Sequence, residues 1–287
     1  MSEDNQNLEN TEVVDALPED GAPSGDATAD RIAALEAELA TAKQDILYAH
    51  ADTQNVRRRL EKELADARAY AAGDRSKRDL AKETLAGVLD GDILIHNHCY
   101  RADEMALVMD MAKEMGYKVT AFHHAVESYK IADLLRENDV CSAIWADWYG
   151  FKMESYDGIR ENAALLWKSG ACVVIHSDDE NGIQRLNQEA AKAQAAGRRM
   201  GLDIPDADVV GWFTLNAAKA MGIDKMTGSL EPGKMADVVL WNGDPLSVYS
   251  RPEKVWIDGA LLYDALDRSR RPVSDFELGQ PGAGDVK

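Results

Sequence analysis

The chain has few cysteines and no long apolar stretch. Its 287 residues include three cysteines, Cys99, Cys141 and Cys172, which are far apart and form no CxxC pair. This scarcity excludes a disulfide-stapled scaffold and a zinc module of paired cysteines, and it is typical of a reducing compartment. No run approaches the ~20 apolar residues of a membrane span, and the N-terminus lacks the basic and apolar regions of a signal peptide. These absences predict a cytoplasmic protein.

Basic residues are also scarce relative to acidic ones. The sequence has 32 Lys and Arg against 51 Asp and Glu, a formal net charge of −19. Long-range electrostatics therefore oppose nucleic acid and anionic membranes as partners. Apolar residues make up 45% of the chain, enough for a sizeable core in one large or two ordinary domains. Collagen-like and wholly disordered classes are excluded.

The first 30 residues contain nine acidic side chains and no Lys or Arg, and Pro and Gly punctuate them. Such a segment cannot bury enough apolar surface to offset its ordering entropy. We predict a disordered acidic tail over residues 1–30.

A helical repeat follows, from Asp30, which can serve as a helix cap. Apolar or small residues alternate in steps of three and four: Ile32, Leu35, Leu39, Ala42, Ile46, Ala49, Thr53, Val56 and Leu60. Charged residues occupy the other faces, and no Gly or Pro occurs before Gly73. This spacing predicts one long coiled-coil helix over residues 31–72 that needs a partner helix to bury its seam.

After residue 73, short apolar runs alternate with amphipathic stretches. Strands are expected at 92–96, 118–122, 140–145 and 172–175, and helices at 80–89, 102–115, 128–137, 158–169 and 183–200. This alternation over residues 73–205 is typical of βα barrels and doubly wound parallel sheets. Residues 206–287 begin with a helix around 212–221, and strands at 237–241, 254–257 and 261–263 predict part of a small β domain.

The histidines mark where chemistry is expected. His96, His124 and His176 each lie at or just past the C-terminal end of an expected strand, which is the edge where parallel α/β folds build active sites. Imidazoles and carboxylates that meet at one edge suit a divalent metal such as zinc. The alternative is that each histidine only forms local hydrogen bonds. No HExxH or CxxC motif decides the matter by spacing alone.

Two C-terminal motifs resemble a known superfamily. They are Thr214–Ile223 (TLNAAKAMGI) and Gly228–Trp241 (GSLEPGKMADVVLW), followed by Gly243–Leu246 (GDPL). From about residue 72 onward the chain resembles the C-terminal half of metal-dependent amidohydrolases, in the imidazolonepropionase-like and prolidase-like branch. The resemblance implies an α/β fold, a partial (β/α)8 TIM-type barrel made of strands five to eight, with the small β segment after it.

The resemblance also implies roles for individual residues. His96 matches the metal ligand on the fifth strand of the family, His124 that on the sixth, and Asp178 that on the eighth. One strand-helix step separates His96 from His124, and two separate His124 from Asp178, which agrees with this assignment. Asp178 would also accept a proton from the water that attacks a small-molecule amide. The implied activity is hydrolysis of a C–N bond, with a divalent metal, zinc, as cofactor.

Other positions near these residues leave alternatives open. His98 could replace His96 as ligand, but a side chain beyond the strand end more often faces substrate, so we assign it to substrate binding. His123 competes with His124 for the sixth-strand position. Trp148 and Tyr149 are expected to line the mouth of the substrate pocket, although aromatic packing between loops explains them equally well.

The N-terminal helix resembles a different family. Arg31–Leu39 (RIAALEAEL), Asn55–Leu60 (NVRRRL) and Ala65–Tyr70 (ADARAY) resemble the long dimerising helix of GrpE-type nucleotide exchange factors, which also carry an acidic tail. This implies a homodimer through residues 31–72 and a DnaK-type chaperone as partner. The alternative to the hydrolase is therefore a non-catalytic coiled-coil module resembling a co-chaperone.

Each resemblance covers only a fragment of its family. The GrpE likeness stops near Tyr70, and the amidohydrolase likeness lacks strands one to four with their HxH pair and their Lys or Glu ligand. A join between Ala71 and Arg75 explains both, as in a chimera. Half a barrel would expose two open sheet edges and an apolar interior, so we expect negligible turnover from this chain alone.

Overall fold

The computed structural model describes residues 25–73 and 78–270. Residues 1–24 of the predicted acidic tail, and residues 74–77 at the predicted join, lie outside the described residues. Contacts divide the chain into two units, Met1–Glu63 and Leu64–Lys287. The division falls within the last turns of the first helix, before the predicted domain boundary at residue 72.

Helix α1 runs from Gly25 to Ala71 and is 47 residues long. It begins before Asp30, so the predicted cap is wrong and residues 25–30 of the predicted tail are helical. The seam residues Ile32, Leu39 and Ile46 are 53%, 54% and 67% exposed, while the side chains at positions 42 and 49 lie outside those described. These three seam residues are therefore largely exposed in this single chain.

The last two turns of α1 belong to the second unit. Ala67 and Tyr70 are buried there, and Arg68 Nη2 donates a 2.9 Å hydrogen bond to the carbonyl of Met115. This contact fixes the end of α1 beside the end of a helix in the second unit.

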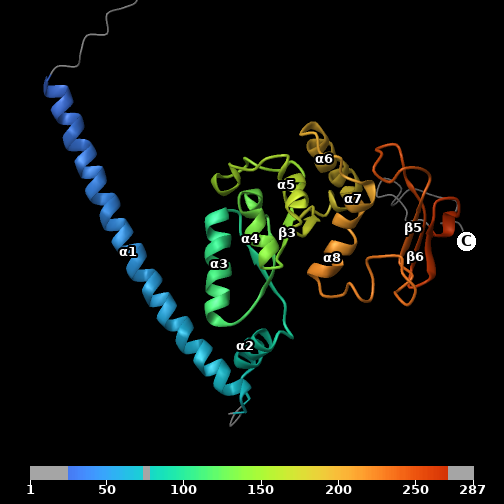
Figure 1. Ribbon diagram of the computed structural model, residues 1–287, viewed down its shortest axis with the longest axis horizontal. Helices are drawn as coiled ribbons and strands as arrows, with labels where there is room; N and C mark the ends of the chain where they lie inside the picture. Colours follow the sequence, from blue (N-terminus) through green and yellow to red (C-terminus); the bar gives the residue numbers. More distant parts are fainter. Residues whose placement is uncertain (1–24, 74–77, 271–287) are drawn as a thin grey trace, which may run out of the picture. The chain divides into compact units, whose positions relative to one another are not determined.

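The second unit contains the predicted alternation of strands and helices (Figure 1). The elements follow in the order α2 (Leu80–Asp90), β1 (Ile95–His98), α3 (Ala102–Met115), β2 (Val119–His123), α4 (Ala132–Glu137), β3 (Cys141–Ile144), α5 (Asn162–Ser169) and β4 (Val173–Ile175). Short 3-10 turns occur at Ser128–Ile131, Met153–Ser155, Ile183–Arg185 and Arg268–Arg270. Strand β1 starts later than predicted, so that both His96 and His98 lie within it.

The four strands form a parallel sheet in the order β1-β2-β3-β4. The register places His98 opposite His123 and Ile144 opposite Ile175, so the strands end at a common edge. Glycines with positive φ help to set this repeat, because Gly116 (φ 75) ends α3 and Gly170 (φ 81) ends α5 just before the next strand. Each helix therefore leads back to the next parallel strand, and the carboxyl ends of all four strands lie at the same edge of the sheet.

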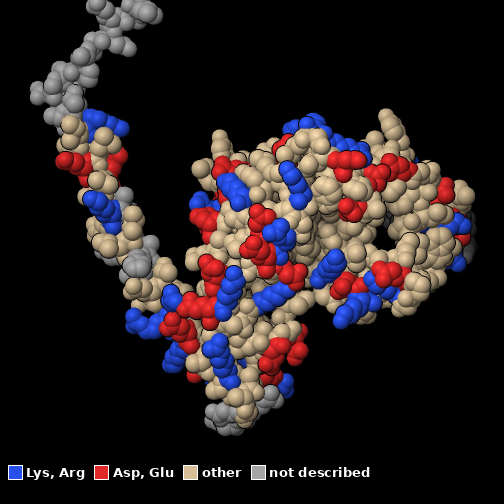
Figure 2. Space-filling view, in the orientation of Figure 1, with Lys and Arg blue, Asp and Glu red and all other residues tan. Residues whose placement is uncertain are grey.

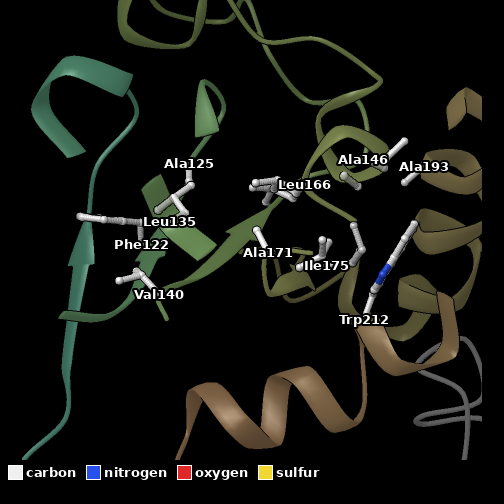
Figure 3. Packing of buried hydrophobic residues seen from close by; sticks show 14 of the residues in the cluster. Phe122, Ala125, Leu135, Val140, Ala146, Leu166, Ala171, Ile175, Ala193 and Trp212 are labelled. Atoms are coloured by element: carbon white, nitrogen blue, oxygen red, sulfur yellow. The ribbon is translucent and has the colours of Figure 1, made fainter. Parts of the chain in front are cut away.

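One face of the sheet carries the main core. Phe122, Leu135 and Leu166 are fully buried and pack in one cluster with Ile144 and Ile175 (Figure 3). These residues come from the strands and from the helices between them, because successive side chains of a strand point to opposite faces. Burial of each large apolar side chain contributes about 1.5–3 kcal/mol.

The opposite face of the sheet is not left open. After β4 come α6 (Leu186–Arg199), α7 (Asp206–Trp212) and α8 (Leu215–Ala220), and Ala217 and Ala220 of α8 pack against Ala121, Cys141, Ala143 and Val174. The expectation of an exposed apolar interior is therefore wrong for this part of the sheet. Small alanine side chains let α8 approach the strands closely.

The C-terminal elements form a separate antiparallel sheet. It contains β5 (Val238–Trp241), β6 (Pro252–Ile257) and β7 (Ala260–Asp264) in that order. Asp258 and Gly259 form the turn between β6 and β7, and both have positive φ. The predicted small β segment is present at the predicted strands.

Two of the three cysteines are joined. Cys141 and Cys172 form a disulfide between the starts of β3 and β4, with their Cα atoms 4.5 Å apart, and Cys99 is free and buried. The expectation of reduced, scattered cysteines is thus wrong for this pair, because adjacent strands bring together residues that are distant in sequence.

Charged side chains are spread over the surface, and several large apolar ones are exposed as well (Figure 2). In the described ranges, no helix combines the length and the apolar character needed to cross a bilayer. Basic and acidic side chains are interspersed over the face of the second unit that Figure 2 shows.

Candidate functional site

Five histidines gather where the parallel strands end. His96 and His98 lie on β1, His123 is the last residue of β2 and His124 follows it, and His176 follows β4. The sheet brings them together because neighbouring parallel strands end side by side. The strand ends that carry these histidines therefore lie together, as predicted. The role of each histidine remains a prediction.

The rings associate in two pairs. His98 Nδ1 lies 2.8 Å from His124 Nε2, and His96 Nδ1 lies 2.9 Å from His123 Nε2. The other nitrogen of His96, Nε2, lies 2.8 Å from the carbonyl oxygen of Ala220 in α8. Both nitrogens of His96 are therefore engaged, and the histidine that the structure places against His124 is His98.

His124 is the centre of the group. It is buried, its backbone is left-handed with φ 58, and its Nδ1 lies 3.8 Å from Asp178 Oδ2. Asp178, on the exposed edge, is also left-handed with φ 53. Such conformations are uncommon for residues other than glycine and cluster at functional sites.

Asn162 holds the turn that follows His124. Its side-chain amide donates hydrogen bonds to the carbonyls of Ala125 (3.0 Å) and Val126 (3.1 Å), and its Oδ1 accepts one from the Tyr129 amide. A buried side chain with all these partners fixes the backbone firmly. Sequence reasoning missed this positioning residue, because nothing in the local pattern around position 162 points to residue 125.

Burial keeps several of these rings neutral. Desolvation, and then the neighbouring histidines, lower the pKa of His176 to about 3 and that of His123 to about 4. Burial also lowers the pKa of His124, although the carboxylate of Asp178 opposes this. Neutral imidazole is the form that binds a metal ion.

The donor set can be tested against a divalent metal. In the described ranges no group of three or more His, Cys, Asp or Glu side chains is arranged to hold an ion as it stands, because the rings are hydrogen-bonded to one another. However, His124 Nδ1 and His176 Nε2 are buried and have no hydrogen-bond partner. Imidazole nitrogen and carboxylate oxygen are the atoms that zinc binds in proteins. The two unpaired nitrogens and the Asp178 carboxylate, 3.8 Å from His124 Nδ1, are therefore suitable ligand types.

Aromatic rings continue the histidine group. Tyr100 stacks on His124 (ring centroids 5.2 Å apart), His124 on Trp145 (4.8 Å), and Trp145 on His176 (4.9 Å). Trp145 is held in place by the 2.8 Å hydrogen bond from its Nε1 to the Ser177 carbonyl. The four rings form a compact cluster, because His124 and His176 lie only 5.3 Å apart and Tyr100 and Trp145 6.3 Å apart between ring centroids.

A cavity of about 510 Å³ opens beside this ring cluster. Its lining comprises Tyr100, Trp145, Trp148, Tyr149, Phe151 and Asp178. Trp148 and Tyr149 both line this cavity, and their role at a pocket mouth stays a prediction. His98 is not among the lining residues and contacts His124 instead. The position of Tyr100 in this lining was missed, and the only available signal was its short spacing from His98.

A family model described as "Amidohydrolase family" matches residues 27–262. The match begins within α1, far before the predicted join. A solved amidohydrolase from Thermotoga maritima MSB8 is similar with 28% identity and a TM-score of 0.62, over 71% of this chain and 55% of that chain.

The curated proteins similar to this chain include an amidohydrolase and a GrpE protein. The amidohydrolase tasK of Hapsidospora irregularis is 30% identical over 191 residues, which are 65% of this chain and 19% of tasK. Protein GrpE of Novosphingobium aromaticivorans is 70% identical over 43 residues, 15% of this chain and 23% of that protein. The chain therefore spans only about a fifth of the length of these two curated relatives.

Proposed function

Because the chain belongs to the amidohydrolase family, we propose that its histidine site is that of a metal-dependent hydrolase of C–N bonds in small amides. The observation that carries the proposal is the buried, left-handed His124, whose unpaired Nδ1 faces Asp178 at 3.8 Å. A neutral imidazole beside a carboxylate is suited both to holding a cation and to moving a proton.

We propose His124 and Asp178 as metal ligands, as the sequence predicted, and we replace His96 by His98 as the ligand from β1. The exchange is supported by the contact of His98 with His124 and by the two hydrogen bonds that already engage His96. His176, whose Nε2 is unpaired, is a further candidate donor. When bound, a divalent ion such as zinc supplies Lewis acidity that lowers the pKa of water and polarises a carbonyl.

The chain's own residues then have distinct tasks. The Asp178 carboxylate accepts a proton from the attacking water and returns it to the nitrogen of the leaving group. Contacts of Trp145 with both His124 and His176 keep the two rings in place, and Asn162 holds the turn after His124. The aromatic cavity beside Asp178 receives the amide, with Trp148 and Tyr149 at its mouth.

We propose that the second unit is a partial barrel, equivalent to strands five to eight. The proposal is supported by four parallel strands and by a match to 55% of the solved relative. In such a fragment the HxH pair and the fourth-strand ligand have no counterpart, and positioning can supply roughly 7 to 11 kcal/mol of a barrier. We therefore expect this chain alone to hydrolyse amides negligibly. A cytoplasmic location stays a prediction from composition.

The coiled-coil alternative concerns α1. We propose that residues 31–72 mediate homodimerisation and give access to a DnaK-type chaperone, which the short stretch of 70% identity to a GrpE protein supports. The family match over residues 27–262 favours the hydrolase as the function of the second unit. A gene-level join near residue 72 remains a proposal as well.

Metal content and turnover test the hydrolase proposal together. Zinc-loaded protein is compared with Asp178→Asn and with the matched control Glu180→Gln, an exposed acid two residues away. We expect bound zinc in wild type and the control, less zinc in Asp178→Asn and in His124→Ala, and negligible turnover of N-acyl amino acids, dipeptides and cyclic amides in all. Equal zinc in all four proteins would remove the site. Robust, Asp178-dependent turnover would refute the argument from the missing strands.

A further inference from the structure

Lys152 differs from the other lysines near the sheet in what it contacts. Lys130 and Lys192 form ion pairs with Asp157 and Asp147, both at 2.7 Å. Lys152 Nζ instead lies 3.9 Å from the centroid of the Tyr100 ring and 5.7 Å from that of Phe151. A cation over aromatic faces is attracted to them, and an ammonium group has three N–H donors, so it can serve a further partner besides Tyr100.

This cation borders the cavity beside the histidines. Lys152 is exposed and is not itself a lining residue, but Tyr100 and Phe151, the two rings that its ammonium group contacts, both line the cavity. Asp178 also lines it. The cavity thus has the Asp178 carboxylate in its lining and a cation next to two of its aromatic residues.

The remaining walls are flat and apolar. Trp145 and Tyr100 are already ordered by stacking on His124, so a ring that enters between the aromatic side chains finds surfaces whose positions are set beforehand. A volume of about 510 Å³ accommodates a small molecule of the size of an acylated amino acid.

We propose that Lys152 and the aromatic walls select the substrate: the cavity takes a small amide that carries an aromatic ring and a carboxylate, with the carboxylate bound to Lys152 Nζ. The ring packs among Tyr100, Trp145 and Phe151, and the amide lies toward His124 and Asp178. This inference rests on the proposed hydrolase site, because it places the scissile bond there.

Equilibrium binding tests the proposal without requiring turnover. Isothermal titration calorimetry compares three probes: N-acetyl-L-tryptophan, its amide, which lacks the carboxylate, and N-acetyl-L-alanine, which lacks the ring. Wild type is expected to bind the acid about fivefold more tightly than the amide, as a partly exposed ion pair allows, and about threefold to tenfold more tightly than the alanine probe.

Two variants assign the selectivity to one side chain. Lys152→Gln should bind acid and amide equally, while Lys168→Gln, an exposed lysine of α5, should keep the fivefold preference. Equal binding of acid and amide by wild type, equal behaviour of the two variants, or no binding of any probe at millimolar concentration would overturn the proposal. Selective binding combined with a failed zinc test would overturn the hydrolase and leave the cavity's selectivity standing.

Discussion

Acid should destabilise the metal-free protein through His176. Its pKa is lowered to about 3 by burial and by the neighbouring histidines, whereas a histidine in the unfolded chain has a pKa of about 6.5. Between these values the unfolded chain binds a proton that the folded chain does not. The free energy of unfolding contributed by this group is therefore complete at neutral pH and is lost as the pH falls.

The size of the effect follows from the two pKa values. Linkage gives a loss of about 2 kcal/mol between pH 7 and pH 5 from His176 alone. His123 acts in the same direction because its pKa is also lowered, to about 4, but it is more accessible to solvent and its contribution is smaller. Bound metal would stabilise the neutral rings further, so the experiment uses a chelator.

Urea unfolding at pH 7, 6 and 5, followed by tryptophan fluorescence, measures this loss. His176→Asn removes the titrating ring, so its unfolding free energy should depend less on pH than that of wild type, by about 2 kcal/mol over the same range. The comparison concerns the slopes, so a uniform loss of stability in the variant does not obscure it. Parallel pH dependence in the two proteins would show that His176 is not held neutral by burial.

Two further predictions concern α1 and the cysteines. A peptide of residues 30–72 should be helical and self-associating, because the apolar seam residues Ile32, Leu39 and Ile46 are exposed in the single chain. Sedimentation of a monomer at high micromolar concentration would contradict this, and Leu39→Lys should give a monomer. Protein denatured without reductant should show one reactive thiol, that of Cys99. Changing Cys141 and Cys172 to Ser should cost about 3–4 kcal/mol for a sequence separation of 31, and three thiols in unreduced protein would refute the bond.

The alternation of strands and helices could be predicted because its signals are local. Leu80 and Ala102 begin helices α2 and α3 as expected, and Gly116 ends α3. The end of β1 was harder, since the run 92–96 is apolar while the sheet pairs residues 95–98. That shift of two residues decides which histidine faces His124.

The missed features all depend on distant residues. Nothing in the sequence shows that Cys141 and Cys172 have Cα atoms 4.5 Å apart, because that distance exists only once β3 and β4 pair. The covering of the sheet by α8 and the support of the His124 turn by Asn162 arise in the same way. Family resemblance supplied the candidate residues at each strand end, but not their pairing.

The hydrogen bond between His96 and the Ala220 carbonyl joins residues 124 positions apart. During synthesis, the first strand leaves the ribosome long before the helix that engages its histidine has been translated. The contact of His96 with α8 therefore forms only after the chain has grown past residue 220. Contacts of such sequence separation are slow to form, so we expect this contact late in folding, and a nascent chain that ends before residue 220 lacks the carbonyl that engages Nε2 of His96.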